Sequence, residues 1–343
     1  MDTQRREFAL IAKYFQNRSY ARTAAVEQGA NSGFVLTANQ RHRRDVALSI
    51  GDDAAVVVPP VDSGIAVTTD TMVAGVHFDD KTPIAAIGHK LVAVNLSDLA
   101  AMGAEPAWLS LSCALPSYDE HWLAEFSRGF FAAADYYHCA LIGGDITRGP
   151  LTLTLTAQGI VPSHRYLTRS GAQPGDRVYV SGTLGDAALA LAAQQGKAQL
   201  SENASQALLQ RLYYPTPRVG LGQLLRNQAS AAIDLSDGLA GDLGHVLQAS
   251  GVGARIQLEL LPCSAEFAAS CTAAEGWPYQ LAGGDDYELC FTVPASRCDG
   301  IETLARQAGV QVTQIGVIEG NPGLRYFHAG ERQELTLQSF SHF

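Results

Sequence analysis

The chain is poor in charge, and most of the charge it has is negative. Charged residues make up 17% of its 343 residues, with 24 Lys plus Arg against 34 Asp plus Glu and a formal net charge of −10. The densest basic cluster, residues 41–44, is short and has the character of a solvated loop. No basic run is long enough to neutralise a track of phosphates, so we expect no nucleic acid partner.

Cysteine pairs and long apolar runs are also missing. The six cysteines are scattered and form no C-x-x-C motif, which is typical of the reduced thiols of a cytosolic protein. No run approaches the roughly 18 apolar residues that a membrane helix needs. Residues 1–10 carry charges where a signal peptide needs its apolar stretch. We therefore expect a cytoplasmic protein with no membrane partner.

Several well-known catalytic motifs are absent. The sequence has no G-x-x-x-x-G-K-[ST] loop, no H-E-x-x-H and no G-x-S-x-G. The glycines at 251 and 253 follow an expected helix and precede an expected strand, the reverse of a dinucleotide site, so they indicate a turn. If a nucleotide binds, acidic loops and metal ions must do the work of a P-loop lysine.

The length and the 47% hydrophobic content favour two domains with substantial cores. Helical and strand periods alternate without a regular βαβ rhythm, which predicts two α+β (mixed α/β) domains. A turn-rich stretch, 169–176, places the boundary just before it, giving domains 1–161 and 162–343. An amphipathic helix over 4–16 and a long polar loop over 18–44 precede the first strands.

The expected helices cover residues 84–102, 119–137, 185–195, 203–212, 218–228, 238–250 and 296–308. The expected strands cover residues 54–58, 65–69, 107–114, 139–142, 151–161, 178–181, 231–235, 254–259, 288–293 and 312–318.

Six junctions beside apolar stretches combine aspartate with Gly, Ser or Thr. They are residues 51–53, 68–71, 95–98, 143–145, 234–238 and 283–286. Carboxylate, hydroxyl and carbonyl oxygens are the ligands that Mg²⁺ prefers, and glycines let backbone N–H groups approach a phosphate. A turn or a helix cap explains any single junction equally well. The six together favour a site for metal ions and phosphates.

Asp98 is the most informative of these aspartates. The core-facing stripe of the expected helix 84–102 contains Ile87, Leu91, Val94 and Ala101. Asp98 falls on that stripe, where an ionised carboxylate is costly unless it is paired or bound to metal. A capped or lysine-paired buried aspartate is the alternative, and a metal ligand explains the position better. His77, two residues past Gly75, is a candidate substrate contact.

The motifs and their order resemble those of thiamine-monophosphate kinases. They are G-D-D, T-T-D-T-x-V-x-G-x-H-F, N-L-S-D-L-A-A-M-G-A, I-G-G-D-x-T-R-G, T-R-S-G-A-x-P-G-D, D-L-S-D-G-L and G-G-x-D-Y-E-L. The resemblance runs from the first helix to the C-terminal aromatic residues. The wider superfamily includes aminoimidazole ribonucleotide synthetase and selenide water dikinase. The resemblance therefore supports the fold more firmly than the identity of the substrate.

The resemblance implies a homodimer whose N-terminal domains pair through their sheets, and a C-terminal α+β domain that closes over a nucleotide. It implies a shell for several Mg²⁺ ions made of Asp53, Thr68, Thr69, Asp70, Asp98, Asp145, Asp234 and Asp237. The catalytic carboxylates among them are expected to be Asp70, Asp98, Asp145 and Asp234. The implied ATP contacts are Gly144, Asp145, Arg169 and Ser236. The implied contacts to thiamine monophosphate are His77, Asp285 and Phe340.

Two features depart from the family pattern. The family usually has Glu where Asp285 stands, and the shorter side chain puts a direct substrate contact in doubt. The loop 18–44 is longer than the usual connection before G-D-D.

The implied reaction is the transfer of a phosphoryl group from ATP to thiamine monophosphate. A substrate phosphate oxygen is the nucleophile, largely ionised because its second pKa is about 6, so no protein base is needed. Two doubly charged phosphoryl groups about 4 Å apart repel by roughly 16 kcal/mol at an effective dielectric of about 20. The chain offers few candidate basic residues to neutralise this charge (Lys90, Arg148, Arg169 and Arg218) but many carboxylates. Several Mg²⁺ ions held by aspartates are therefore expected to neutralise it. We expect in-line transfer without a phosphoenzyme.

Two other functions remain open. A sibling synthetase could act on a different phosphate, although a selenide water dikinase would need a reactive cysteine near the N-terminus and the first cysteine here is Cys113. A protein that binds metal and nucleotide without catalysis would bind ATP and Mg²⁺ but release no ADP.

Overall fold

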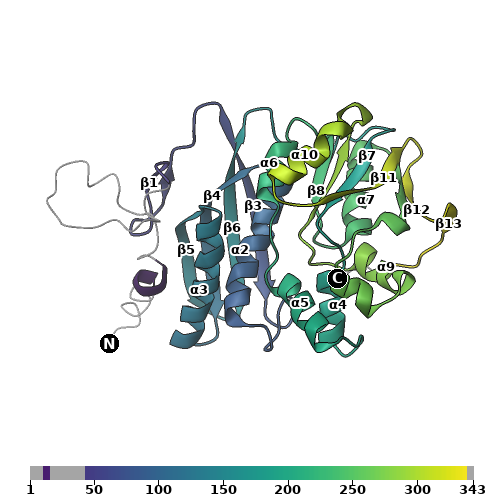
Figure 1. Cartoon of the computed structure of the whole chain (residues 1–343). Helices are drawn as coiled ribbons and strands as arrows, with labels where there is room; N and C mark the ends of the chain where they lie inside the picture. Colours follow the sequence, from purple (N-terminus) through teal and green to yellow (C-terminus); the bar gives the residue numbers. More distant parts are fainter. Residues whose placement is uncertain (1–10, 16–42, 338–343) are drawn as a thin grey trace. The chain divides into compact units, whose positions relative to one another are not determined.

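The computed structural model describes residues 11–15 and 43–337 (Figure 1). The chain divides into two compact units. The first comprises Met1–Leu99 and Glu105–Ser163, and the second comprises Ala100–Ala104 and His164–Phe343. The boundary expected between residues 161 and 162 stays a prediction. The short segment Ala100–Ala104, which no sequence pattern set apart, is counted with the second unit.

The first unit is built on a four-stranded sheet in the order β3-β6-β4-β5. Its strands are β3 (Ser63–Val73), β4 (Glu105–Leu115), β5 (Ala140–Arg148) and β6 (Thr152–Pro162). The central strand pairs β3–β6 and β6–β4 are antiparallel, and β4 pairs with β5 in parallel. A small separate pair joins β1 (Val46–Leu48) to β2 (Val56–Val57).

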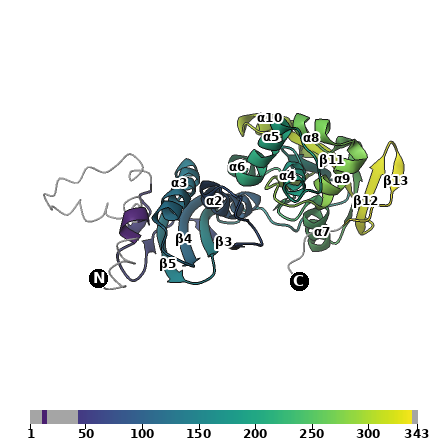
Figure 2. The same cartoon turned by 90° about the horizontal axis from the view of Figure 1, so that it is seen from below.

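One face of this sheet is covered by helices α2 (Ile84–Ala101) and α3 (Glu120–Tyr136), both of which lie on the same side of the strands in Figure 2. The covered side chains of β6, Leu153, Leu155 and Ala157, have no exposed surface. Side chains alternate along a strand, so the threonines between them lie on the opposite face. The sheet therefore has one apolar face and one hydroxyl-rich face.

Helices α2 and α3 approach each other closely because each has a glycine at the contact. A Cβ on Gly129 would lie 1.7 Å from the Ala85 carbonyl oxygen, and one on Gly88 would lie 2.3 Å from that of Phe126. Among the described residues, α2 is long and apolar enough to cross a membrane by length and composition, but 83% of it is buried. It is the core helix of this unit.

The second unit is built on a seven-stranded sheet in the order β13-β12-β9-β11-β7-β10-β8. The strands are β7 (Arg177–Ser181), β8 (Ala231–Asp234), β9 (Gly253–Gln257), β10 (Leu289–Val293), β11 (Val312–Glu319), β12 (Gly323–His328) and β13 (Glu331–Gln333). The helices are α4 (Asp186–Gln194), α5 (Glu202–Tyr213), α6 (Val219–Leu225), α7 (Leu239–Ser250), α8 (Ala265–Ser270), α9 (Ala273–Ala282) and α10 (Ile301–Gln307). Every pair in the sheet is antiparallel except β12–β9.

Local sequence explains where several helices begin. Asp119 caps α3 by accepting hydrogen bonds from the backbone N–H groups of His121 and Trp122. Thr272 and Glu275 form a reciprocal capping box at the start of α9. These side chains satisfy backbone donors that have no partner inside the helix.

The α+β class is confirmed, and each expected helix and strand from residue 84 to 318 has a counterpart in the structure. Helices α8 and α9 and strands β1, β12 and β13 were not expected. Of the predicted helix 4–16, the described part is a π-helical turn over Ile11–Phe15. Nearly all of the predicted loop 18–44 lies outside the described residues.

Candidate active site

Three of the predicted site residues meet beneath the sheet of the first unit. Thr68 and Asp70 are two residues apart on β3, so both side chains point to the face that α2 covers. Asp98 lies in the last turns of α2, and the Thr68 hydroxyl donates a hydrogen bond to its Oδ2. Burial, and then the charge of Asp98, raise the pKa of Asp70 to about 6. Two carboxylates and a hydroxyl therefore share a partly desolvated space.

The side chain of Thr69 does not join this group. It lies on the opposite face of the sheet, where its hydroxyl is 2.9 Å from Thr156 Oγ1. The next outward residue, Thr71, is likewise 2.9 Å from Thr154 Oγ1. A metal contact from Thr69 on the covered face would have to come from its main-chain carbonyl.

Asp145 is separated from Asp70 within this unit. The strand registers place Asp145 opposite Ser112, Ser112 opposite Thr154, and Thr154 opposite Thr71. Asp145 therefore shares the open face with Thr71, three strands away, a separation of about 14 Å at about 4.8 Å per strand. The Asp70 and Asp145 side chains do not meet in a single copy of this sheet.

Gly144, beside Asp145, has a backbone requirement that explains the glycine. Its φ is +153°, and a Cβ there would lie 1.8 Å from the Leu111 carbonyl oxygen.

Asp53 is exposed, just before the β2 strand. His77 follows β3, and its Nδ1 accepts a hydrogen bond of 3.1 Å from the Val73 N–H. That bond assigns the proton of a neutral His77 ring to Nε2.

In the second unit, two acidic junctions lie side by side. The segment 234–238 follows β8, and the segment 283–287 precedes the neighbouring strand β10. The Asp285 N–H donates to the Ser236 carbonyl at 3.0 Å, and the Tyr287 N–H donates to the Leu235 carbonyl at 2.8 Å. A Cβ on Gly284 would lie 2.5 Å from the Ser236 oxygen, so glycine permits this contact. The structure thus brings Asp234, Ser236 and Asp237 next to the loop that carries Asp285.

That loop has an unusual backbone. Asp285 and Tyr287 have φ values of +72° and +49°, in the left-handed region that non-glycine residues avoid. Such conformations cost roughly 1–3 kcal/mol each and persist where the surroundings enforce them. The Tyr287 hydroxyl donates to Asp285 Oδ1 at 3.0 Å. The left-handed turns place these two side chains in contact.

The carboxylates of Asp286 and Glu288, in the same loop, point into the protein interior. Both oxygens of Asp286 accept from the Gly185 N–H at the start of α4, at 2.9 and 3.1 Å. Glu288 is fully buried and accepts from Arg211 at 2.7 Å, from Arg218 Nε at 2.6 Å and from Ser181 at 2.6 Å. Burial raises the pKa of Asp286 well above its usual value. Arg218, expected to face phosphate, is committed to Glu288.

Asp242 supports the acidic junction formed by residues 234–238. It is buried in the first turn of α7, and its Oδ2 accepts from the N–H groups of Asp237 and Gly238 at 3.0 and 3.2 Å. Burial, opposed by these hydrogen bonds and assisted by the charge of Asp237, raises its pKa to about 7. Arg169 is exposed in the same unit, and Phe340 lies outside the described residues.

Comparisons with known proteins identify the family of the chain. The family models for AIR synthase related protein match the chain twice, the N-terminal domain at residues 51–161 and the C-terminal domain at residues 173–328. The thiamine-monophosphate kinases of Salmonella typhimurium and Haemophilus influenzae are 44% and 43% identical to it, over 98% of each chain. The chain belongs to the thiamine-monophosphate kinase family.

Solved structures of family members have the same fold. The thiamine-monophosphate kinase from Stenotrophomonas maltophilia K279a is 46% identical, with a TM-score of 0.80 over 86% of this chain and 95% of that chain. The structure of AaThiL complexed with AMPPCP and TMP is 33% identical, with a TM-score of 0.73 over 86% and 92% of the two chains.

Some residues of the candidate site were not identified from the sequence. Asp242, Asp286, Tyr287 and Glu288 hold the acidic junctions, but none was among the expected site residues. Glu288 offers a signal, because it is a charged residue at the head of an otherwise apolar strand, where burial needs a partner. Its partners, Arg211 and Arg218, lie 70 or more residues away in sequence and have no pattern that identifies them.

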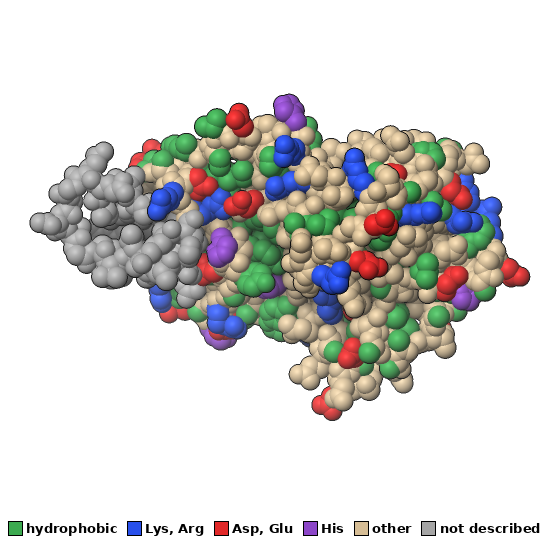
Figure 3. Space-filling model, turned by 45° about the horizontal axis from the view of Figure 1, so that its top comes forward, with side chains coloured by type: hydrophobic (Ala, Val, Ile, Leu, Met, Phe, Trp, Pro, Cys, Tyr) green, Lys and Arg blue, Asp and Glu red, His purple; other side chains and the backbone are tan. Residues whose placement is uncertain are grey.

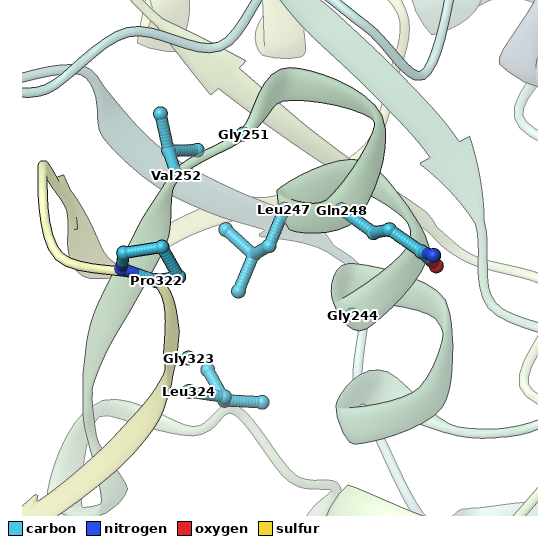
Figure 4. A pocket seen from close by; sticks show the side chains of 8 residues that line it. All are labelled: Gly244, Leu247, Gln248, Gly251, Val252, Pro322, Gly323 and Leu324. Carbon is cyan, nitrogen blue, oxygen red and sulfur yellow. The ribbon is translucent and has the colours of Figure 1, made fainter.

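A surface pocket of about 370 Å³ lies elsewhere in the second unit (Figure 4). It is formed by the C-terminal half of α7 and the loop before β12, and its lining includes Leu247, Val252, Pro322 and Leu324. None of its lining residues is charged, so it does not suit a phosphate. It shares no residue with the acidic junctions 234–238 and 283–287.

Proposed function

We propose that this chain transfers the terminal phosphoryl group of ATP to thiamine monophosphate, giving ADP and thiamine diphosphate. This is the last step of thiamine diphosphate biosynthesis. The observation that carries the proposal is the full-length similarity to thiamine-monophosphate kinases, including the AaThiL complex with AMPPCP and TMP. The paired carboxylates Asp70 and Asp98 support it, because phosphoryl transfer depends on groups that hold cations against phosphate.

Magnesium is part of this proposal. The oxygen donors of Thr68, Asp70 and Asp98 have the chemistry that Mg²⁺ prefers. Burial, and then the charge of Asp98, raise the pKa of Asp70, and a divalent ion would offset both the lost hydration and the repulsion between the two carboxylates. The fit is incomplete, because within residues 11–15 and 43–337 no three His, Cys, Asp or Glu side chains form a metal-binding group. Substrate phosphates would supply the remaining ligands.

The side chains divide the work as follows in our proposal. Asp70 and Asp98 in the first unit, and separately Asp234 and Asp237 in the second unit, would hold magnesium ions, which would supply positive charge to neutralise phosphate. The Arg169 guanidinium pairs with a nucleotide phosphate as a two-pronged donor. Asp285 and His77 contact thiamine monophosphate. The attacking phosphate oxygen is already ionised at neutral pH, so transfer proceeds in line without a protein base or a phosphoenzyme.

A second copy of the chain completes the site in this proposal. The open face of the first unit's sheet exposes Ile65 by 43% and Val67 by 62%, so it is suited to burial against another copy. Asp145 lies on that same face, away from Asp70. In a homodimer paired through these faces, Asp145 would lie at the interface and would contact nucleotide or metal there, on the side of the sheet opposite to Asp70 and Asp98. We further propose that the protein works in the cytoplasm without nucleic acid or membrane; Figure 3 shows acidic side chains interspersed with basic ones on one face.

The decisive experiment measures ADP release from MgATP by purified protein, with and without thiamine monophosphate, and with an EDTA control. Release that needs both the substrate and the metal, with thiamine diphosphate as product, is the expected result. Folded protein that binds ATP but is not stimulated by thiamine monophosphate would point to a sibling synthetase or to a binding protein.

A further inference from the structure

The loop that carries Asp285 is held from its interior side. Asp286 is bound by the Gly185 N–H at the start of α4, and Glu288 is bound by two arginines and Ser181. These anchors sit on α4, α5 and β7 and on the segment before α6, all parts of the second unit's scaffold. The backbone on both sides of Tyr287 is therefore fixed by buried contacts.

The same backbone turns Tyr287 toward Asp285. Residues two apart on an extended strand point the same way, but here both have left-handed φ values, and the loop is bent between them. The Tyr287 hydroxyl lies 3.0 Å from Asp285 Oδ1 and is its donor. A hydrogen bond to an ionised carboxylate is stronger than one between neutral groups, and it fixes the direction of the carboxylate.

Asp285 needs such a restraint more than a longer acid would. A carboxylate on one methylene has a short reach, so its direction decides whether it meets a ligand. The hydrogen bond from the Asp285 N–H to the Ser236 carbonyl fixes the backbone of Asp285. The hydrogen bond from the Tyr287 hydroxyl fixes the position of its carboxylate. The contact between Tyr287 and Asp285 requires two residues with strained backbone conformations. Such strain is typically kept where the resulting geometry has a function.

We propose that Tyr287 is the positioning residue for Asp285, and that its hydroxyl aims this carboxylate at the thiamine part of the substrate. This inference rests on the function proposed above. Tyr287 itself acts through Asp285 and takes no part in the transfer of the phosphoryl group. Its removal therefore weakens recognition of thiamine monophosphate and leaves the handling of ATP unchanged.

The test is Tyr287→Phe, which removes only the hydroxyl and keeps the ring. We expect the KM for thiamine monophosphate to rise roughly tenfold, the effect of one hydrogen bond to a charged group, while kcat and the KM for ATP change less than about twofold. The matched control is Tyr179→Phe in the same unit, since the Tyr179 hydroxyl is also hydrogen-bonded, to Gln314 at 3.4 Å. This control is expected to leave the KM for thiamine monophosphate unchanged.

A double-mutant cycle separates positioning from stability. In an Asp285→Ala background, Tyr287→Phe should add no further rise in the KM for thiamine monophosphate, because its target is gone. A full additional rise there, an equal rise in the KM for ATP, or an unchanged KM in the single variant would each overturn the inference while the wild type remains active. A wild type that neither binds nor phosphorylates thiamine monophosphate would overturn the proposed function, and this inference with it.

Discussion

Replacing Asp70 with Asn tests whether the first unit destabilises the ionised Asp70 carboxylate, first through burial and then through the charge of Asp98. Raising the pKa of Asp70 from 3.8 to about 6 corresponds to about 3 kcal/mol at about 1.36 kcal/mol per pH unit. The side chain is only partly buried, so solvent reduces this figure, and we expect Asp70→Asn to stabilise the metal-free protein by about 1–2 kcal/mol at pH 8. This corresponds to a rise in Tm of about 2–8 °C.

The pH dependence of that gain follows from the direction of the shift. Folded protein keeps the Asp70 proton to a higher pH than unfolded protein, so ionisation of Asp70 destabilises the fold as the pH rises from about 4 to about 6. Below about pH 4 the carboxyl is protonated in both states, and the variant should match the wild type. The gain should grow through this window and be complete above it.

Thermal unfolding in EDTA, at several values between pH 4 and pH 8, measures this difference. Asp80→Asn, at an exposed aspartate of the same unit, controls for the change in net charge. Added Mg²⁺ should then raise the Tm of the wild type more than that of Asp70→Asn, because the cation stabilises only the state that binds it. Equal Tm values at pH 8 without metal, or the same gain at all pH values, would refute the reasoning.

Three further changes have defined outcomes. Asp98→Asn should reduce turnover by at least about 100-fold with an unchanged circular dichroism spectrum, since a metal ligand is lost; near-normal activity would remove Asp98 from the site. Thr68→Val, which removes the hydroxyl that binds Asp98, should lower kcat/KM about tenfold, and Thr69→Val, on the other face, several times less; equal losses would contradict the assignment of faces. Glu288→Gln should cost about 3 kcal/mol in urea unfolding, because two partly buried arginines lose the charge of their fully buried partner, and a cost near zero would contradict this role for Glu288.

The sequence predicted the fold well where apolar residues continue through a whole element. Helix α2 and strand β6 show a clear apolar pattern, and both were expected within two residues of their bounds. Helices α8 and α9 were missed because α8 has six residues and α9 contains Pro278, so neither shows a sustained helical period. Strands β12 and β13 are mostly half-exposed and lack a continuous apolar face.

The sequence pointed to the acidic residues of the candidate site but not to the residues that hold them in place. Asp98 stood out because a carboxylate on an apolar stripe is costly, and the structure provides Thr68 and Asp70 beside it. The anchors of the second unit depend on tertiary contacts between distant segments, such as Asp286 with Gly185, which no spacing in the sequence encodes. Tyr287 lies two positions after Asp285, a predicted site residue. Its proposed role depends on a left-handed backbone conformation that only the structure reveals.

The T-T-D-T stretch of β3 serves two surfaces at once. Thr68 and Asp70 face α2 and Asp98, whereas Thr69 and Thr71 face the open side, where their hydroxyls meet those of β6. Because side chains alternate with a period of two, one strand cannot direct all four toward a single ion. If the open face pairs with a second copy, a shift of this strand by one residue would exchange the cation-binding and pairing faces together. The continuous eleven-residue pairing of β3 with β6, without a bulge, fixes that register and so couples the proposed metal site to the proposed dimer.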